Sequence, residues 1–203
     1  MAKLFFRYGA MGSSKTAHAL MVHYNYQERE TRNRKALLLK PELENRDGTN
    51  VLKSRIGLQA EVETVESFIS RTYNRKPVDL AAEISAIIID EAQFLTESQV
   101  DFFAGMVDTC VIPVICYGLR TDFTGHFFQG SKRLMELADE IEEIPTVCWC
   151  GRKARFSARV QDGKVVRTGA QVQMGGNESY ISLCRKHYQQ GQLGPERTGG
   201  IHE

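Results

Sequence analysis

Short apolar runs of strand length, separated by segments with helical spacing, constrain the fold of this chain most strongly. Five such runs occur at 3–8, 35–40, 60–65, 85–90 and 111–118. Strands that are apolar on both faces, with helices between them, are typical of a parallel sheet covered by helices. We therefore expect an α/β fold, with helices at 15–29, 66–75, 97–108 and 131–139. Candidate helix N-caps are Ser67 and either Thr96 or Ser98.

The pattern changes from Cys148 onward. The stretch RFSARVQDGKVVRT alternates around Asp162–Gly163, a dipeptide that favours a tight hairpin turn. We therefore expect three parts: an α/β domain over 1–147, a small β module over 148–190, and a disordered polar tail over 191–203. The segment 41–58 has little periodicity for its length and is a candidate functional loop.

Charge and hydropathy exclude several classes of protein. The chain has 203 residues, with 26 Lys and Arg against 25 Asp and Glu, so its net charge is +1. This balance gives no sign of the broad cationic surface that grips nucleic acid. No apolar stretch approaches the roughly 18 residues of a membrane helix, and the N-terminus lacks the layout of a secretory signal. We expect a cytoplasmic protein with neither a nucleic-acid nor a membrane partner.

The stretch G-A-M-G-S-S-K-T, Gly9–Thr16, has the form of a phosphate-binding loop. In such a loop, backbone N–H groups between a strand and a helix surround phosphate, Lys15 would reach the β- and γ-phosphates, and Thr16 would hold Mg²⁺. Ser14 stands where the consensus has glycine. If that position needs a positive φ, serine costs on the order of 1 kcal/mol, unless Gly12 supplies the flexibility. A glycine- and serine-rich turn without a ligand is the alternative.

The stretch SAIIIDEAQF, 85–94, strengthens the nucleotide hypothesis. A buried parallel strand that ends in Asp90 places a carboxylate at the carboxyl edge of the sheet, where Mg²⁺ would lie. Glu91 follows it and could act as a base toward a hydroxyl group or water. The alternative is an acidic strand end that caps the next helix. Together, the two stretches predict nucleoside-triphosphate binding.

The five cysteines fall into two groups. Cys110 and Cys116 flank or lie within an apolar run and are expected to be buried thiols. The others, with one histidine, form a candidate zinc site whose ligands are Cys148, Cys150, Cys184 and His187. Three thiolates and an imidazole fill a tetrahedral site, so this zinc would be structural. The single residue between the first two cysteines is fewer than usual, and buried thiols with a surface histidine are the alternative.

These motifs resemble the type II thymidine kinases, the cytoplasmic zinc-containing class. The resemblance runs through the phosphate loop, DEAQF, YGLRTDF, CWCGRKA, GGNESY and CRKHY, in family order up to about residue 190. It implies a RecA-like P-loop domain over 1–147 and a zinc-binding lasso domain over 148–190. It also implies transfer of the ATP γ-phosphate to the 5′-hydroxyl of thymidine, and of deoxyuridine, in pyrimidine salvage. A homotetramer and feedback inhibition by dTTP are implied as well.

The resemblance also assigns roles to residues. Glu91 would be the proton acceptor, and Asp90 would act through Mg²⁺. The implied ATP-binding residues are Gly9, Ala10, Met11, Gly12, Ser13, Ser14, Lys15, Thr16, Asp90, Glu91, Ala92 and Gln93. The segment 171–180 resembles the lasso that covers the thymine base with main-chain hydrogen bonds. The implied substrate-binding residues are Met11, Phe94, Phe123, Gln173, Met174, Gly175, Gly176 and Tyr180.

Alternatives stay open for several of these residues. Phe94 and Phe123 could be core aromatics. Arg55 could contact phosphate or simply be solvated, and Gln93 could orient the carboxylates or have no role. His18 and His23, on the first predicted helix, are expected to be exposed.

Two other functions compete with the kinase. The DEAQ string and a zinc ribbon also suggest a nucleic-acid-stimulated P-loop ATPase, although such motors generally need a second lobe that 203 residues do not hold. The third hypothesis is an adaptor, stapled by zinc, that binds nucleotide without turnover.

Overall fold

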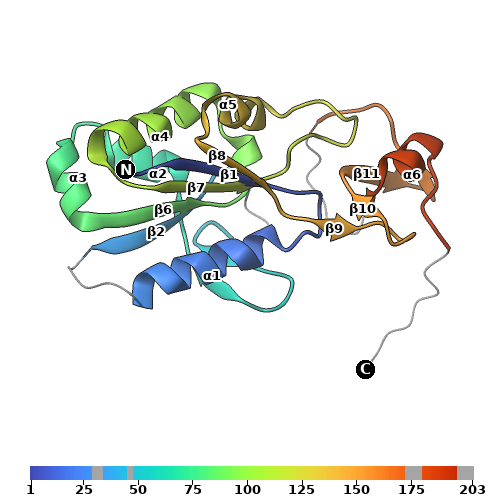
Figure 1. Cartoon of the computed structure of the whole chain (residues 1–203), viewed down its shortest axis with the longest axis horizontal. Coiled ribbons are helices and arrows are strands. Elements are labelled where there is room, and N and C mark those ends of the chain that lie inside the picture. The colour runs from blue at the N-terminus through green and yellow to red at the C-terminus, as the bar shows by residue number, and fades with distance from the viewer. Residues whose placement is uncertain (29–33, 45–47, 172–179, 196–203) are drawn as a thin grey trace. The chain divides into compact units, whose positions relative to one another are not determined.

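The computed structural model describes residues 1–28, 34–44, 48–171 and 180–195 (Figure 1). The chain divides into two compact units. The first, which we call the sheet unit, comprises Met1–Gly9, Ser14–Arg120 and Phe127–Ile144. The second, the hairpin unit, comprises Ala10–Ser13, Thr121–His126 and Pro145–Glu203.

A six-stranded parallel sheet forms the centre of the sheet unit, with strand order β5-β2-β6-β7-β1-β8. Its strands are β1 (Leu4–Tyr8), β2 (Lys35–Lys40), β5 (Glu63–Thr64), β6 (Ile84–Ile89), β7 (Val114–Gly118) and β8 (Glu140–Glu143). This confirms the predicted α/β class. Because all strands run the same way, their carboxyl ends meet at one edge of the sheet.

The helices of this unit are α1 (Lys15–Glu28), α2 (Val65–Thr72), α3 (Pro77–Glu83), α4 (Glu97–Cys110) and α5 (Gln129–Leu137), with a 3₁₀ turn, η1 (Ala92–Phe94). Figure 1 shows α1 on one face of the sheet and α3, α4 and α5 on the other. The alternation along β6 explains this arrangement. Ile88 packs in the same core as Leu20 of α1, whereas Ile87 and Ile89 pack with Phe103 of α4. Both faces of the strand are buried, as the continuous apolar run predicts.

The predicted strand at 60–65 is wrong in outline. It divides into β4 (Gln59–Glu61), which pairs antiparallel with β3 (Val51–Lys53), and the two-residue β5 at the sheet edge. Glutamates alternate with apolar residues here, so the run cannot be buried on both faces. The predicted loop 41–58 thus contains a strand and a turn, while its residues 45–47 lie outside the described part of the chain.

Of the predicted helix N-caps, one is wrong and one is confirmed. Thr64, not Ser67, caps α2: its Oγ1 accepts the Ser67 N–H at 3.2 Å. Thr96 caps α4 as predicted, within a reciprocal capping box with Gln99. The apolar run 111–118 is strand only from Val114 onward, since α4 extends to Cys110 and Val111 ends it with a left-handed φ of 55°. Neither α3 nor β8 was predicted from the sequence.

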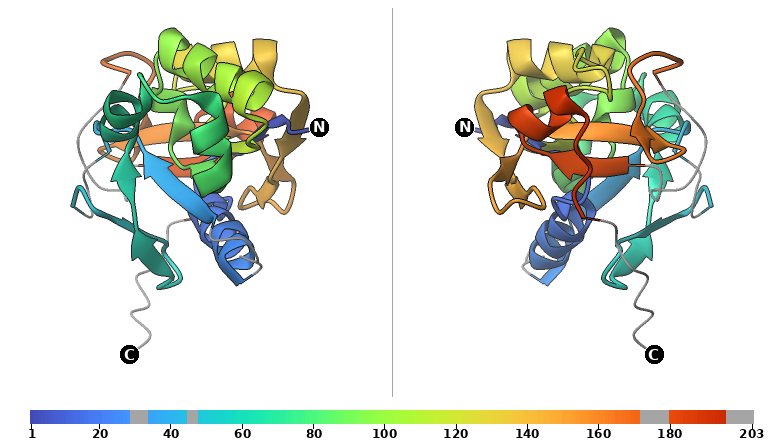
Figure 2. Two further views of the ribbon diagram at one scale, coloured as in Figure 1. Left: turned by 90° about the vertical axis from the view of Figure 1, so that its left-hand side faces the viewer. Right: turned by 90° about the vertical axis from the view of Figure 1, so that its right-hand side faces the viewer.

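The hairpin unit contains short antiparallel strands and one helix (Figure 2). They are β9 (Thr146–Val147), β10 (Lys153–Ala154), β11 (Phe156–Gln161), β12 (Lys164–Val165), β13 (Tyr180–Leu183) and α6 (Arg185–Gln190). The turn between β11 and β12 falls at the predicted dipeptide, where Asp162 and Gly163 have φ of 50° and 70°. Two consecutive left-handed residues match the twist of a tight hairpin.

The start of the predicted tail is packed. The indole N–H of Trp149 donates to the Gln192 carbonyl at 3.2 Å, and a Cβ on Gly194 would lie 2.8 Å from the Trp149 ring. Leu193 joins the core of the hairpin unit. Residues 196–203 lie outside the described part of the chain.

Helix α1 fully or partly buries two histidines that were expected to be exposed. His23 is 7% exposed, with its Nε2 3.1 Å from the Ala36 carbonyl, and His18 is half-buried, edge-on to Tyr117. The prediction that these histidines are exposed was therefore wrong, because α1 packs its length against the sheet.

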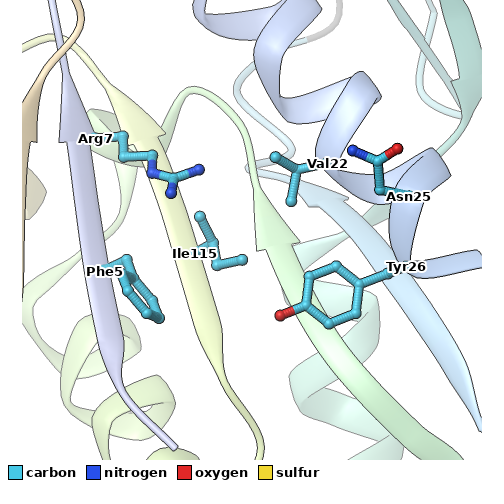
Figure 3. Close-up of a pocket in the computed structure, with 6 residues that line it drawn as sticks. All are labelled: Phe5, Arg7, Val22, Asn25, Tyr26 and Ile115. Atoms are coloured by element: carbon cyan, nitrogen blue, oxygen red, sulfur yellow. The ribbon is translucent and has the colours of Figure 1, made fainter. Parts of the chain in front are cut away.

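A pocket of about 270 Å³ lies between α1 and strands β1 and β7 (Figure 3). Its lining residues are Phe5, Arg7, Val22, Asn25, Tyr26 and Ile115. None of the predicted site residues lines it. In the described ranges, no helix has the length and apolar character that a membrane span requires.

Candidate active site

The predicted phosphate loop joins the end of β1 to the start of α1. Ser14 has a φ of 58° and Gly12 a φ of 76°, so the backbone is left-handed at both positions. Position 14 therefore has the positive φ that is costly for serine, and the positive φ of Gly12 does not remove this cost. The Ser14 carbonyl accepts the His18 N–H at 3.0 Å, and the Gly9 N–H donates to the Gly118 carbonyl at 3.2 Å. These bonds connect the ends of the loop to α1 and to β7.

Lys15 is buried and its Nζ donates to the Gly9 carbonyl at 3.3 Å. Burial lowers the pKa of Lys15, and the negative charges of Glu91 and Asp90 act in the opposite direction. The nearby charge of Arg55, an exposed residue after β3, lowers the pKa of Lys15 further. The first residue of α1 and the two acids after β6 therefore act on one another electrostatically, although β7 separates β1 from β6 in the sheet.

Asp90 directly follows β6 and is 1% exposed. Burial and the charge of Glu91 raise the pKa of Asp90 to about 7, while Thr16 and Lys15 act to lower it. Among the residues that the structure describes, the Thr16 hydroxyl and the Glu91 N–H lie close enough to lower the pKa of Asp90, but neither meets a carboxylate oxygen in good hydrogen-bonding geometry. Buried, unpartnered carboxylate oxygens near a hydroxyl group suit a hard divalent cation such as Mg²⁺.

Glu91 is the second strained residue of this site, with φ of 51° and ψ of 35°. A non-glycine residue in this region costs roughly 1–3 kcal/mol and persists only where its surroundings fix it. Here Gln93 fixes the side chain, since its Nε2 donates to Glu91 Oε2 while its Oε1 accepts the Leu119 N–H at 2.9 Å. Gln93 therefore orients Glu91, one of the two alternatives that the sequence left open.

Two glycines allow the close packing around Gln93, which is 2% exposed. A Cβ on Gly118 would lie 2.8 Å from Gln93 Oε1, and a Cβ on Gly130 would lie 2.6 Å from the Leu95 carbonyl oxygen. Real Cβ atoms do not approach so closely, so β7 and α5 can contact η1 only through glycine. Phe94, in η1, is half-buried and edge-on to Phe128 at 5.7 Å.

In the hairpin unit, Met11 is held by two serines that the sequence analysis did not single out. The Met11 N–H donates to Ser157 Oγ at 2.9 Å, and Ser182 Oγ donates to the Met11 carbonyl. Ser157 and Ser182 face each other across β11 and β13. The alternating pattern of β11 was visible in the sequence, but nothing in the sequence showed that β11 pairs with β13 and so brings Ser157 opposite Ser182.

Two of the predicted substrate-binding residues, Phe123 and Tyr180, meet at Arg159. The Arg159 guanidinium lies 3.8 Å from the centre of the Phe123 ring, and its Nε donates to the Tyr180 hydroxyl at 2.9 Å. The sequence analysis missed Arg159, since arginines on a short hairpin are usually solvated. The predicted residues Gln173, Met174, Gly175 and Gly176 lie outside the described residues.

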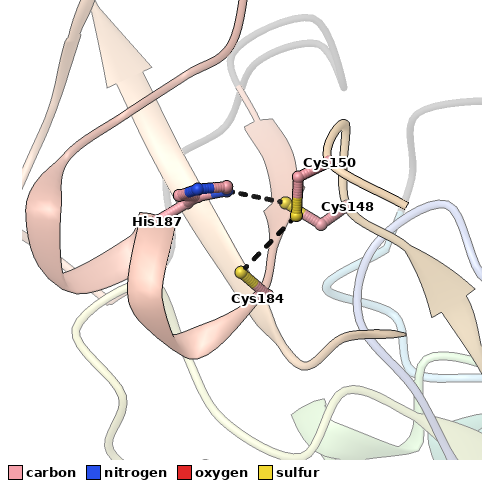
Figure 4. Close-up of side chains that lie close together, drawn as sticks. All are labelled: Cys148, Cys150, Cys184 and His187. Carbon is pink, nitrogen blue, oxygen red and sulfur yellow. Dashed lines mark hydrogen bonds between the residues drawn. The ribbon is translucent and has the colours of Figure 1, made fainter. Parts of the chain in front are cut away.

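The predicted zinc ligands come together in the hairpin unit (Figure 4). Cys148 Sγ lies 3.4 Å from His187 Nδ1, Cys150 Sγ lies 4.0 Å from Cys184 Sγ, and the four ligand atoms are all within 4.8 Å of one another. Zn–S bonds of about 2.3 Å at tetrahedral angles separate two thiolates by about 3.8 Å. The cluster is therefore compatible with zinc. The His187 backbone amide lowers the pKa of Cys184, which favours the thiolate that a metal needs.

Trp149, the residue between the first two cysteines, covers one ligand. Its ring stacks on His187 with centroids 4.2 Å apart and planes 10° apart. Gly194 also packs closely against the Trp149 ring. The short spacing of this cysteine pair thus places a large aromatic ring directly beside the cluster.

A loop with left-handed turns, a lysine and a threonine at the start of a helix, and an acid pair after a strand of the same parallel sheet define a P-loop nucleotide-binding protein. The family model described as "Thymidine kinase" matches residues 2–188. The chain belongs to the thymidine kinase family, and it is therefore a kinase.

Curated thymidine kinases are similar in sequence to this chain along nearly its whole length. A thymidine kinase of Pasteurella multocida is 44% identical over 200 residues, covering 94% of this chain and 98% of the relative. One of Mannheimia succiniciproducens is 44% identical and covers all of both chains. One of Lactococcus lactis is 44% identical over 93% of this chain and 97% of the relative.

Among solved structures, the Pif1 helicase from Candida albicans is 14% identical, with a TM-score of 0.41 over 70% of this chain and 36% of the helicase. A likeness this weak has no bearing on function.

Proposed function

We propose that this protein transfers the γ-phosphate of ATP to the 5′-hydroxyl of thymidine to give dTMP. Membership of the thymidine kinase family over residues 2–188 supports the reaction. The observation that carries the proposal for this chain is electrostatic. The negative charges of Glu91 and Asp90, after the end of β6, both act to raise the pKa of Lys15, at the start of α1. One lysine that can neutralise phosphate thus lies near two carboxylates, of which one could hold a cation and the other could act as a base.

In this proposal, the residues Gly9–Thr16 bind ATP and Lys15 neutralises charge on its β- and γ-phosphates. Phosphoryl transfer depends on positioning and charge neutralisation more than on covalent chemistry, so the loop amides and Lys15 supply most of the acceleration. Glu91 accepts the proton of the 5′-hydroxyl, and its hydrogen bond from Gln93 holds the carboxylate in place.

Asp90 and Thr16 are the residues that would hold Mg²⁺, because the buried carboxylate oxygens of Asp90 offer a hard cation two ligand atoms. When bound, this ion adds positive charge beside the transferring phosphoryl group. The Thr16 hydroxyl already acts on Asp90, since it lowers the pKa of that carboxyl.

The proposal also includes a nucleoside site. We assign it the residues Met11, Phe94, Phe123, Gln173, Met174, Gly175, Gly176 and Tyr180. An apolar pocket with a base edge read by backbone groups discriminates through shape and through polar groups that a wrong base leaves unpaired. Zinc on the four-residue cluster would stabilise the small β module, whose own core is limited.

The organisation of the enzyme follows the same proposal. A P-loop kinase domain would span 1–147, a zinc-binding lasso domain 148–190 and a tail 191–203. We further propose a cytoplasmic homotetramer, inhibited by dTTP, that also accepts deoxyuridine and does not act on nucleic acid.

One assay tests the activity. The purified protein is incubated with Mg²⁺ and ATP alone, with thymidine, and with single-stranded DNA, and both phosphorylated nucleoside and free phosphate are measured. We expect dTMP, formed in a one-to-one ratio with ADP, only when thymidine is present. Phosphate release stimulated by DNA would instead indicate a motor ATPase, and nucleotide binding with no product would indicate an adaptor.

A further inference from the structure

Arg159 is a buried cation at the middle of β11, with 5% of its surface exposed. Its guanidinium donates three hydrogen bonds. Nε donates to the Tyr180 hydroxyl at 2.9 Å, Nη1 to the Ala170 carbonyl at 3.0 Å and Nη2 to the Gln171 carbonyl at 3.3 Å. One side chain therefore contacts β13 and the segment that follows β12.

The flat face of the same guanidinium reaches a third segment. It lies 3.8 Å from the centre of the Phe123 ring and 5.4 Å from the centre of the Tyr180 ring. Phe123 is also held from its backbone, since its carbonyl accepts the Tyr188 hydroxyl at 2.7 Å. The three segments at 121–126, 170–171 and 180–183 thus meet at Arg159.

A neighbouring contact joins two of these segments a second time. The Gln171 side chain donates to Asp122 Oδ2 at 2.9 Å, and Asp122 Oδ1 accepts the N–H groups of Thr124 and His126. Burial acts to raise the pKa of the Asp122 carboxyl, but the Thr124 hydroxyl, which donates to Oδ1 at 2.7 Å, and these other bonds lower it. The segments at 121–126 and 170–171 are therefore joined both through Arg159 and through the bond from Gln171 to Asp122.

The chemistry of this contact requires arginine. Within the described ranges, no carboxylate lies at ion-pair distance from Arg159, and the partners that the structure describes for its charge are neutral oxygens and ring faces. Burying a cation in this way is costly, and an apolar residue would cost less. Lysine has neither the planar fork nor the flat face, so it could not make the same contacts. In addition, the Tyr180 oxygen accepts from Arg159, which leaves its own hydrogen for another acceptor.

We propose that Arg159 is a positioning residue for the nucleoside. It holds Phe123 and Tyr180, two residues assigned to the thymidine site, in one arrangement without touching the substrate itself. This inference rests on the proposed function. Its consequence is selective: losing Arg159 weakens thymidine binding and leaves ATP binding intact, because the bonds that hold Met11 of the phosphate loop come from Ser157 and Ser182 and not from the guanidinium.

The test compares Arg159→Met and Arg159→Lys with a matched control, Arg155→Met, whose exposed side chain lies at the start of the same hairpin. The KM for thymidine, the KM for ATP and kcat are measured for each. A hydrogen bond from a charged group, such as the one from Arg159 to Tyr180, favours one arrangement of the site about tenfold, so both Arg159 variants should raise the thymidine KM about tenfold or more. The ATP KM should stay within about twofold, and Arg155→Met should resemble the wild type in both.

Zinc content and the fluorescence of Trp149 report whether the hairpin unit is folded. If Arg159→Met fails these checks, Tyr180→Phe decides the question, because it removes only the hydroxyl that Arg159 contacts. We expect Tyr180→Phe to raise the thymidine KM alone, and its effect to be less than multiplicative with that of Arg159→Met.

An unchanged thymidine KM in folded Arg159→Met, or in Tyr180→Phe where that variant decides, overturns the proposal. A parallel rise of the thymidine and ATP KM values also overturns it, since a general structural role predicts that result. A wild-type protein that does not phosphorylate thymidine would instead overturn the proposed function, before any variant is compared.

Discussion

Replacing Glu91 with glutamine tests the base in the proposed mechanism. Glutamine has nearly the same shape and keeps an oxygen that can accept the Gln93 Nε2–H, so the local packing is preserved. What it loses is a negative charge and the ability to take a proton. A positioned general base contributes about 10² to 10⁴-fold, which corresponds to about 2.7–5.5 kcal/mol of transition-state stabilisation. We expect kcat to fall by this factor.

Nucleotide binding should not fall with turnover. The charge of Glu91 raises the pKa of Asp90, so its removal lowers that pKa and leaves Asp90 more fully ionised at neutral pH. The carboxylate that would hold Mg²⁺ is then at least as available as before. ATP affinity, measured by calorimetry with Mg²⁺, should therefore equal or exceed that of the wild type.

The assay measures dTMP formation at saturating ATP and thymidine. Glu97→Gln, the same change at an exposed position at the start of α4, is the control and should keep kcat within about twofold of the wild type. A Glu91→Gln enzyme with a kcat within about threefold of the wild type would refute the assignment. A parallel loss of ATP binding would show instead that Glu91 serves the nucleotide site.

Three further predictions follow from the strained loop, the buried acid and the cysteine cluster. Ser14→Gly should raise the free energy of unfolding by up to about 1 kcal/mol in urea titrations, because it removes the cost of a left-handed serine, less the added entropy of the unfolded chain; a lower midpoint would contradict this. In the protein without ligand or metal, the buried Asp90 carboxyl has a raised pKa of about 7, so its contribution to stability is complete below pH 4 and is lost as the pH rises to 7. The stability of the wild type relative to Asp90→Asn should fall across this range by up to about 1.4 kcal/mol per pH unit, and a flat difference would exclude the shift. Elemental analysis should find one zinc per chain, and removing it with a chelator should change the fluorescence of Trp149, the sole tryptophan, which stacks on His187; zinc-free protein with unchanged fluorescence on chelation would contradict the site.

The sequence predicted best those features whose cause is local or periodic. The run at 85–90 is apolar on both faces, so only a strand buried between two layers of helices accommodates it, and β6 is that strand. Asp162–Gly163 tolerates the left-handed turn of its hairpin, and Thr96 satisfies the first amides of α4. The four predicted zinc ligands come together, as expected for two pairs of soft ligands in a small β module.

The sequence failed where the outcome depends on which segments meet. The run at 60–65 divides because its first half pairs with β3 and its second half with β2, a choice that no local pattern encodes. His23 is buried because α1 lies along the sheet, which the weak amphipathic pattern of that helix did not reveal.

The candidate site shows the same division. Residue types and their order alone determined that this chain has a phosphate loop, an acid pair at a strand end and a cysteine–histidine cluster, because each requires particular chemistry at fixed spacing. Only the tertiary structure decided that Gln93 holds Glu91, that Ser157 and Ser182 hold Met11, and that Arg159 joins Phe123 to Tyr180. These contacts link side chains from separate elements, and their partners are selected by strand pairing and close packing, which sequence spacing does not specify.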